Sequence, residues 1–220
     1  MGCNKHFTLD GLRKPAKSNG TILASDSWRL IILMEIKEHI RKRLASLIPR
    51  KLKNGYAREA AVLMPIFKKD DTYHLLLTRR TEEVQTHKGQ IAFPGGMREQ
   101  EESLLDTALR ETFEEVGIEN SRIEPLGRFH DYVSITRYRV TPFVGFVQDP
   151  FDTKRQVQEV AEILHVPFEV FLDPGRLRVE RNMHPGREAD VYFYSYGAHE
   201  IWGLTARIIK DFFDTLNLRR

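Results

Sequence analysis

A segment bounded by two glycines, Gly96 and Gly117, constrains the fold of this chain more than any other. Apolar residues recur at steps of three and four from about Glu102 to Val116, and this spacing predicts a helix over that range. Gly117 then stands where a left-handed residue commonly ends a helix. At 100° per residue, the helix face that we expect to pack on the core carries Leu105, Ala108, Leu109, Thr112 and Val116.

Three glutamates, Glu111, Glu114 and Glu115, share the edge of this helix next to its apolar face. Carboxylates at these spacings repel one another by about 0.2–0.5 kcal/mol per pair, and the helix dipole disfavours negative charge in the last turn. A divalent cation such as Mg²⁺ or Mn²⁺ reverses both effects, because these ions prefer oxygen ligands. Taken alone, the triplet is more typical of a solvated acidic face, so both interpretations stay open at this point.

The rest of the chain predicts one mixed α/β domain. Its 220 residues suit a single domain with extensions. The polar segment 1–33 lacks periodicity and predicts a poorly ordered N-terminal extension to a domain over 34–220. The predicted strands form hairpins rather than strict β-α-β alternation, so we do not expect a doubly wound nucleotide-binding fold. Besides the glutamate-bearing helix, we expect helices at 34–48, 167–172 and 204–216 and strands at 58–67, 73–78, 89–93, 122–132, 138–147 and 191–196, with 158–164 ambiguous.

Composition excludes several classes of protein. Hydrophobic residues make up 41% and charged residues 30%, which excludes global disorder and collagen-like repeats. The net charge of +3 comes without the basic stripe and interleaved aromatics of a nucleic-acid binder. The longest apolar run, 30–34, is far short of the roughly 20 residues that span a bilayer. The single cysteine, Cys3, excludes an internal disulfide and favours a reducing compartment. We therefore expect a cytoplasmic protein that binds neither nucleic acid nor a membrane.

The spacing of the charged residues around the helix is more specific than the triplet alone. It reads as Gly96, five residues, Glu102, seven residues, Arg110-Glu111, two residues, Glu114-Glu115, one residue, and Gly117 followed by an aliphatic. This pattern resembles the Nudix box, and every charged and glycine position of that box is filled. One position departs, because Thr112 stands where the box has an aliphatic residue. Its methyl group can pack on the core and its hydroxyl can bond back to the preceding turn, so we expect no effect on the chemistry.

The resemblance implies a fold, an activity and a set of roles. The fold is an α/β/α sandwich with a mixed β-sheet and the carboxylate-bearing helix on one face. The activity is Mg²⁺- or Mn²⁺-dependent hydrolysis of a diphosphate linked to another moiety. Glu111 and Glu115 would be the main metal ligands with help from Glu114, and Arg110 would orient these glutamates. Glu102 would support the loop or a further cation, and Gly96 would allow a sharp turn.

A second resemblance narrows the substrate. The segments 76–81 and 87–96, read LLTRRT and HKGQIAFPGG, resemble the coenzyme A diphosphatase branch of the Nudix hydrolases. Segments 138–145, 159–162 and 201–207 are similar to the same branch. The implied substrate is coenzyme A or a derivative, and the products are 3′,5′-ADP and 4′-phosphopantetheine. The candidate substrate-binding residues are Arg79, His87, Gln90, Gly95 and Gly96, with Arg80 and Lys88 as weaker candidates. The alternative is that Arg79 and Arg80 simply flank the end of a strand.

Several questions stay open at this point. The general base is Glu111, acting through a water held by the cation, or a downstream carboxylate, with Glu159 and Glu162 as the candidates. A second enzymatic hypothesis keeps the chemistry and changes the substrate to an ADP-sugar, NADH or a dinucleoside polyphosphate. A third is a non-catalytic ligand sensor or nucleic-acid-binding module, which the intact glutamate set argues against. We also expect the substrate to be a small molecule and the protein to be a monomer or a homodimer.

Overall fold

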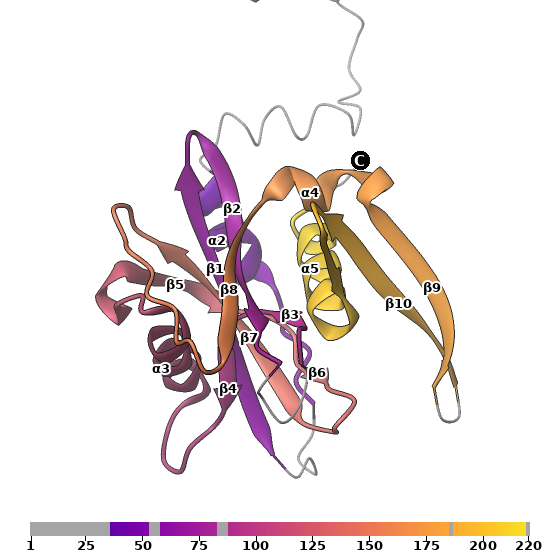
Figure 1. The fold of residues 1–220 in the computed structure, drawn as a ribbon, viewed down its shortest axis with the longest axis horizontal. Coiled ribbons are helices and arrows are strands. Elements are labelled where there is room, and N and C mark those ends of the chain that lie inside the picture. The colour runs from indigo at the N-terminus through magenta and orange to yellow at the C-terminus, as the bar shows by residue number, and fades with distance from the viewer. Residues whose placement is uncertain (1–35, 53–57, 83–87, 185–186, 219–220) are drawn as a thin grey trace, which may run out of the picture.

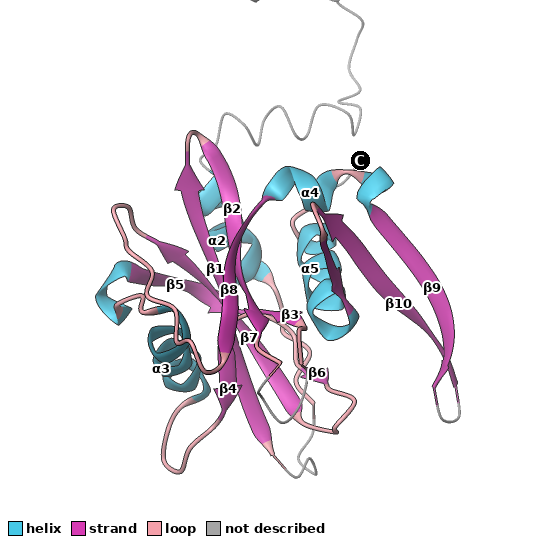
Figure 2. Ribbon diagram, viewed as in Figure 1, coloured by secondary structure: helices cyan, strands magenta, loops and turns pink. Residues whose placement is uncertain are grey.

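The computed structural model describes residues 36–52, 58–82, 88–184 and 187–218. Within them, two β-sheets and four α-helices form a layered α/β structure (Figures 1 and 2). The predicted N-terminal extension over 1–33 lies outside these residues. None of the helices in the described ranges is long and apolar enough to cross a membrane.

The larger sheet is mixed. Strands β1 and β2 form an antiparallel hairpin, β1 also pairs in parallel with β7, and β5 pairs antiparallel with β7. Strands β3 and β8 pair with β2, and the short strands β4 and β6 pair with β1 and β7. The strands are β1 Glu59–Lys69, β2 Thr72–Arg80, β3 Ile91–Ala92, β4 Gly95–Met97, β5 Ile123–Arg128, β6 Tyr132–Val133, β7 Arg139–Val147 and β8 Val160–Pro167.

A second, smaller sheet is antiparallel and has the order β11-β10-β9. Its strands are β9 Leu177–His184, β10 Arg187–Tyr196 and β11 His199–Trp202. Its inner residues, including Tyr194 and Ile201, are fully buried against the C-terminal helix and join the main core. This sheet therefore extends the domain rather than forming a separate one.

Helices cover both faces of the larger sheet. The helices are α2 Ile36–Ser46, α3 Leu104–Val116, α4 Phe168–Leu172 and α5 Gly203–Thr215, with short 3₁₀ turns at Asn120–Arg122 and Pro174–Arg176. One core cluster joins α2 and α5 to side chains such as Met64 and Leu77. A second cluster joins Ala108 and Val116 of α3 to Leu76 on the opposite face of the same strands. The predicted α/β/α sandwich, with a mixed sheet and the carboxylate-bearing helix on one face, is confirmed.

The structure corrects several predicted elements. The predicted strand 122–132 is two strands, β5 and β6, separated by residues 129–131, where the Asp131 amide donates to the Arg50 carbonyl and not to β7. The ambiguous segment 158–164 is strand β8. Strands β9 and β11 were not predicted, and neither was β4, which contains Gly95 and Gly96 and pairs with β1.

Candidate active site

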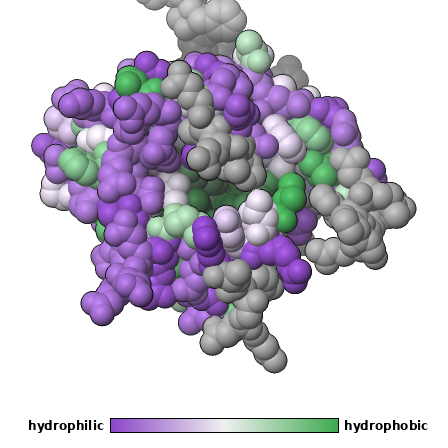
Figure 3. Space-filling view, turned by 60° about the horizontal axis from the view of Figure 1, so that its bottom comes forward, coloured by the Kyte–Doolittle hydropathy of each residue, from purple (hydrophilic) through white to green (hydrophobic). Residues whose placement is uncertain are grey.

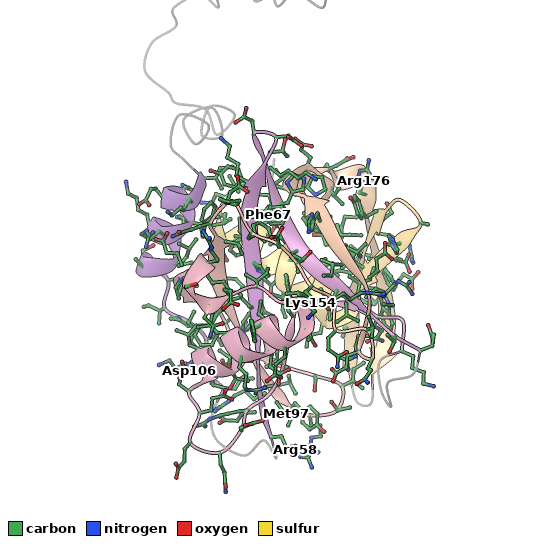
Figure 4. All side chains as sticks on the ribbon, turned by 60° about the vertical axis from the view of Figure 1, so that its left-hand side comes forward. Arg58, Phe67, Met97, Asp106, Lys154 and Arg176 are labelled. Carbon is green, nitrogen blue, oxygen red and sulfur yellow. The ribbon has the colours of Figure 1, made fainter. Side chains whose placement is uncertain are left out.

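Helix α3 begins and ends as its sequence predicts. The Ser103 hydroxyl accepts a hydrogen bond from the Asp106 amide at 3.1 Å and caps the N-terminus. Gly117 adopts the left-handed conformation with φ of 74°, and its amide donates to the Phe113 carbonyl at 2.8 Å. The Thr112 hydroxyl donates to the Ala108 carbonyl at 2.6 Å, which is the back-bond expected for this position. Figure 4 shows α3 between the strand that carries Met97 and the segment that carries Lys154.

Arg110 joins three of the glutamates. Its Nε donates to Glu102 at 2.9 Å, and its Nη1 donates to Glu111 at 2.9 Å and to Glu114 at 3.1 Å. Its Nη2 also donates to the Met97 carbonyl on β4 at 3.2 Å. These charge-assisted bonds fix the guanidinium in one orientation. The carboxylates are thereby held on the side of α3 that faces β4.

Glu102 is saturated with hydrogen-bond donors. Besides Arg110, its carboxylate accepts from the Thr107 hydroxyl at 2.8 Å and from the Glu99 amide at 3.3 Å. The Arg110 guanidinium, followed by the Thr107 hydroxyl and the Glu99 amide, lowers the pKa of Glu102 to about 2. With its oxygens engaged, Glu102 fits the loop-supporting role better than the role of a metal ligand.

Glu111 packs directly on the backbone of β4. A Cβ built on Gly96 would lie 2.4 Å from the Glu111 carboxyl carbon, so only glycine leaves room for this carboxylate. Burial raises the pKa of Glu111, the neighbouring Arg110 lowers it in part, and Glu114 and Glu159 raise it further. Gly96 therefore has a contact role here in addition to the turn that the sequence predicted.

The helical wheel placed Glu115 at the edge next to the apolar face, and in the structure it is the most buried of the three glutamates of α3. Its side chain is buried, with 5% of the residue exposed, and its Oε2 has no hydrogen-bond partner among the described residues. Burial raises the pKa of Glu115 to about 8, Arg80 counteracts this in part, and Glu111 and Glu159 raise it further. A hydrogen bond from the Gly95 backbone offsets only a small part of this rise. A buried carboxylate with an unsatisfied oxygen is costly unless a cation meets it.

A distant loop covers the end of α3 and brings Glu159 to it. The amide of Gln156 donates to the Glu115 carbonyl at 3.0 Å, and the amide of Thr81 donates to the Glu159 carbonyl at 2.9 Å. This loop joins β7 to β8 and packs on the C-terminal end of α3 at Glu115, Val116 and Gly117. Glu159 therefore lies close enough to Glu111 and Glu115 to raise the pKa of both.

Adjacent arginines on β2 lie on opposite faces of the sheet. Arg80 faces α3, where its Nη1 is 3.8 Å from Glu115 and its Nη2 is 4.0 Å from Glu159. Arg79 faces away from α3 and donates to Glu162 at 3.2 Å, and His199 of β11 lies 3.4 Å from the same carboxylate. The structure thus groups Glu159 with the helix glutamates and Glu162 with Arg79. Of the two downstream candidates for the base, only Glu159 is electrostatically coupled to the glutamates of α3.

The remaining candidates for substrate binding are spread along the loop between β2 and β4. Gln90 contributes its carbonyl to the Arg80 amide at 2.9 Å, and Lys88 is exposed. Gly95 has φ of 152°, and a Cβ added to it would lie 2.4 Å from the carbonyl oxygen of Ala61. His87 lies outside the described residues.

The donor set fits a hard divalent cation. No group of three or more His, Cys, Asp or Glu side chains in the described part of the chain converges as a formed metal site. Arg110 instead holds Glu111 and Glu114, and Glu115 keeps one oxygen unsatisfied. All the available donors are carboxylate oxygens, which Mg²⁺ and Mn²⁺ prefer. The unsatisfied Glu115 oxygen is the position at which such an ion would relieve a cost that the protein alone does not.

Comparison with known proteins agrees with this site. Residues 57–192 match the model of the NUDIX domain. An uncharacterized Nudix hydrolase NudL of Photorhabdus laumondii is 40% identical over 164 residues, covering 74% of this chain and 87% of the relative. Its namesake in Yersinia enterocolitica is 39% identical over 166 residues, covering 74% and 83%. The crystal structure of a MutT/nudix family protein from Enterococcus faecalis superimposes with a TM-score of 0.49 at 17% identity, covering 89% of this chain and 74% of that one. The chain belongs to the Nudix family and is a Nudix hydrolase.

Proposed function

We propose that this Nudix hydrolase cleaves the diphosphate bond of coenzyme A or its derivatives, with Mg²⁺ or Mn²⁺, to give 3′,5′-ADP and 4′-phosphopantetheine. One observation carries the metal-dependent part of this proposal. Glu115 is buried with an unsatisfied oxygen beside Glu111 and Glu159, an arrangement that a divalent cation would stabilise. The choice of substrate rests on the resemblance of 76–81 and 87–96 to the coenzyme A diphosphatase branch.

The roles of the residues follow from their chemistry. When bound, the cation screens the charge of the diphosphate and lowers the pKa of a water. Glu111 and Glu115 would hold it, and Arg110 keeps Glu111 and Glu114 oriented toward β4. We assign the general base to Glu159, since it is coupled to both metal-binding glutamates and approaches from outside the helix.

Two further features support coenzyme A over a simpler nucleotide. Figure 3, in which the bottom of Figure 1 is turned toward the viewer, shows a hollow with a hydrophobic floor. A hollow of this kind suits the methylene and gem-dimethyl groups of the pantetheine arm, with its amides left to polar groups at the rim. Arg79 offers a cation for the 3′-phosphate, because its partner Glu162 is 40% exposed and an arginine can exchange one exposed carboxylate for a phosphate.

The test compares substrates side by side. The protein is incubated with Mn²⁺ and either coenzyme A, an ADP-sugar, NADH or a dinucleoside polyphosphate, and the products are separated by chromatography. We expect the highest kcat/KM for coenzyme A, with release of 3′,5′-ADP. Preference for another diphosphate would reject coenzyme A and keep the chemistry. No turnover with any of them, together with salt-dependent binding of RNA or DNA, would favour a binding module.

A matched pair of variants separates the site from general charge effects. Glu115→Gln removes the buried carboxylate, whereas Glu119→Gln changes an exposed glutamate just beyond the end of α3. We expect Glu115→Gln to lower kcat by at least about 100-fold, in line with the loss of a group that holds the catalytic ion. Glu119→Gln should match the unmodified protein.

A further inference from the structure

The guanidinium of Arg80 lies between two carboxylates without a hydrogen bond to either. Its Nη1 is 3.8 Å from Glu115, and its Nη2 is 4.0 Å from Glu159. Its Nε is buried and has no hydrogen-bond partner in the described part of the chain. A paired arginine normally donates to a carboxylate at about 2.7–2.9 Å. Arg80 is therefore close enough for electrostatic attraction but is not locked into place.

The backbone directs Arg80 to this position. The pairing of β2 with β8 shifts register between Arg79 and Arg80, so that Arg79 opposes Glu162 and Arg80 opposes Val160. The extra residue, Ala161, lies on β8, whereas successive side chains along β2 point to opposite faces of the sheet, so Arg80 points to the face opposite that of Arg79. The Arg80 amide is fixed to the Gln90 carbonyl on the loop that leads to β4. The two arginines thereby serve opposite faces of the sheet.

The charges around Arg80 explain why a cation is needed there. Glu115 is 5% exposed, and Glu111 and Glu159 are its acidic neighbours. Arg110, the other cation of the site, is already engaged by Glu102, Glu111 and Glu114. Arg80 is thus the cation positioned to compensate Glu115 and Glu159.

We propose that Arg80 is a positioning residue that acts as an internal counter-ion: it compensates Glu115 and Glu159 when no divalent cation is bound, and it competes with that cation for the same carboxylates. The inference rests on the proposed metal-dependent function of this site. A divalent ion held by Glu115 would lie within a few ångströms of the guanidinium and be repelled by it. Arg80 therefore weakens the binding of the ion and, in its absence, offsets the negative charge of the acidic cluster around Glu115 and Glu159.

The test measures Mn²⁺ binding directly, without turnover. The free-ion electron paramagnetic resonance signal of Mn²⁺ is titrated with the unmodified protein and with Arg80→Gln, Arg80→Lys and Arg79→Gln. We expect Arg80→Gln to lower the Kd for Mn²⁺ by about threefold to tenfold, because one repelling charge is removed. Arg80→Lys keeps the charge and should stay within about twofold of the unmodified protein. Arg79→Gln, on the other face of the same strand, should leave the Kd for Mn²⁺ unchanged.

A second measurement follows the fold. Metal-free Arg80→Gln should melt at a lower temperature than the unmodified protein, and Mn²⁺ should raise its melting temperature by a larger amount. If Arg80→Gln does not fold, Glu159→Gln is compared with Arg80→Gln/Glu159→Gln, in which one charge of each sign is removed. The double variant should bind Mn²⁺ more tightly than Glu159→Gln alone.

The outcomes distinguish this inference from the proposed function. A Kd for Mn²⁺ that is unchanged or raised in Arg80→Gln, while the unmodified protein binds Mn²⁺, overturns the counter-ion role and leaves the metal site intact. Absence of Mn²⁺ binding in the unmodified protein overturns the metal site itself, and the counter-ion role with it.

Discussion

The carboxylate of Glu111 lies against the backbone of Gly96, so closely that a Cβ on Gly96 would stand 2.4 Å from the carboxyl carbon. The contact joins the helix that carries the glutamates to strand β4, which pairs with β1 in the centre of the sheet. Arg110 reinforces this junction from α3, since it bonds to both Glu111 and the Met97 carbonyl. The position of the Glu111 carboxylate is thus set by strand β4 and not only by its own helix.

Replacing Gly96 tests this contact. Gly96→Ala should displace the Glu111 carboxylate and lower kcat by about 100-fold, because displacements of about 1 Å have effects of this size. The free energy of unfolding should change by less than about 1 kcal/mol, since the added methyl meets the end of a flexible side chain. Gly197→Ala is the control. The φ of 58° at Gly197 would strain the backbone of an alanine, but an added Cβ there would meet no atom within 4 Å. Gly197→Ala should lower the free energy of unfolding and leave kcat unchanged. A Gly96→Ala variant that loses stability but keeps its kcat would show that the contact with Glu111 does not matter for catalysis.

The network around Glu102 predicts a loss of stability at low pH. The folded-state pKa of about 2 lies below the ordinary value of 4.5, so this carboxylate stabilises the fold above pH 4.5 and its contribution is lost as the pH falls toward 2. Glu102→Gln should reduce the free energy of unfolding by about 1–2 kcal/mol at pH 7, as expected for a hydrogen-bonded charge. Urea denaturation between pH 2.5 and pH 7 checks this. If the free energies of unfolding of the unmodified protein and Glu102→Gln differ by the same amount at every pH in this range, the effect comes from the shape of the side chain and not from its charge.

Glu115 predicts the opposite dependence on pH in metal-free protein. Its folded-state pKa of about 8 lies above the ordinary value of 4.5, so the folded protein keeps a proton that the unfolded chain releases. The free energy of unfolding should therefore fall as the pH rises from about 5 to 8, by at most about 1.4 kcal/mol per pH unit. Glu115→Gln should remove this slope.

The measurement is urea denaturation with a chelator at pH 5, 6, 7 and 8. The quantity to compare is the difference between the unmodified protein and Glu115→Gln, because His130 and His165 titrate in the same range. Burial lowers the pKa of both histidines, so their contribution to stability rises with pH and opposes that of Glu115. Equal slopes in the two proteins would mean that Glu115 is charged in the metal-free fold.

We expect an aliphatic residue to be tolerated in place of Thr112, the position at which this chain departs from the family pattern. The hydroxyl bonds to the Ala108 carbonyl at 2.6 Å within the same helix, and the side chain is fully buried. Thr112→Val keeps the shape and removes a bond that competes with the helix ladder. We expect the free energy of unfolding to change by less than about 1 kcal/mol and kcat to stay the same. A large loss of kcat would show that this departure affects the chemistry.

Much of the fold could be predicted from periodicity and local signals. Helix α3, its Gly117 cap and the β1–β2 hairpin follow from patterns that lie within short stretches of sequence. Strand β9 was missed because charged and polar residues occupy most of its length and Arg181 interrupts the alternation of its apolar residues Leu177, Val179 and Met183. Strand β11 has four residues and gains its stability from β10 and α5, which periodicity does not reveal.

The site could be predicted only in part, for a physical reason. The glutamates of α3 were identified from spacing, but the wheel placed all three on the same edge next to the apolar face and did not distinguish Glu115, because it describes one helix in isolation. In the fold Glu115 is buried, and the loop after β7 reaches the end of its helix through the bond from the Gln156 amide to the Glu115 carbonyl, a contact distant in sequence. Arg79 and Arg80 lie on opposite faces of the sheet because side chains alternate along a strand. The predicted strand 73–78 ended before these two residues, so the alternation was not predicted for them.

Calorimetric titration of Mn²⁺ at pH 7, in two buffers with different enthalpies of ionisation, tests the central claim most directly. A cation that binds to Glu115 must displace the proton that its pKa of about 8 retains. We predict that the unmodified protein releases about one proton per bound ion, and that Glu115→Gln binds Mn²⁺ more weakly and without this release. No binding to the unmodified protein, or equal binding and equal proton release in both proteins, would contradict the account.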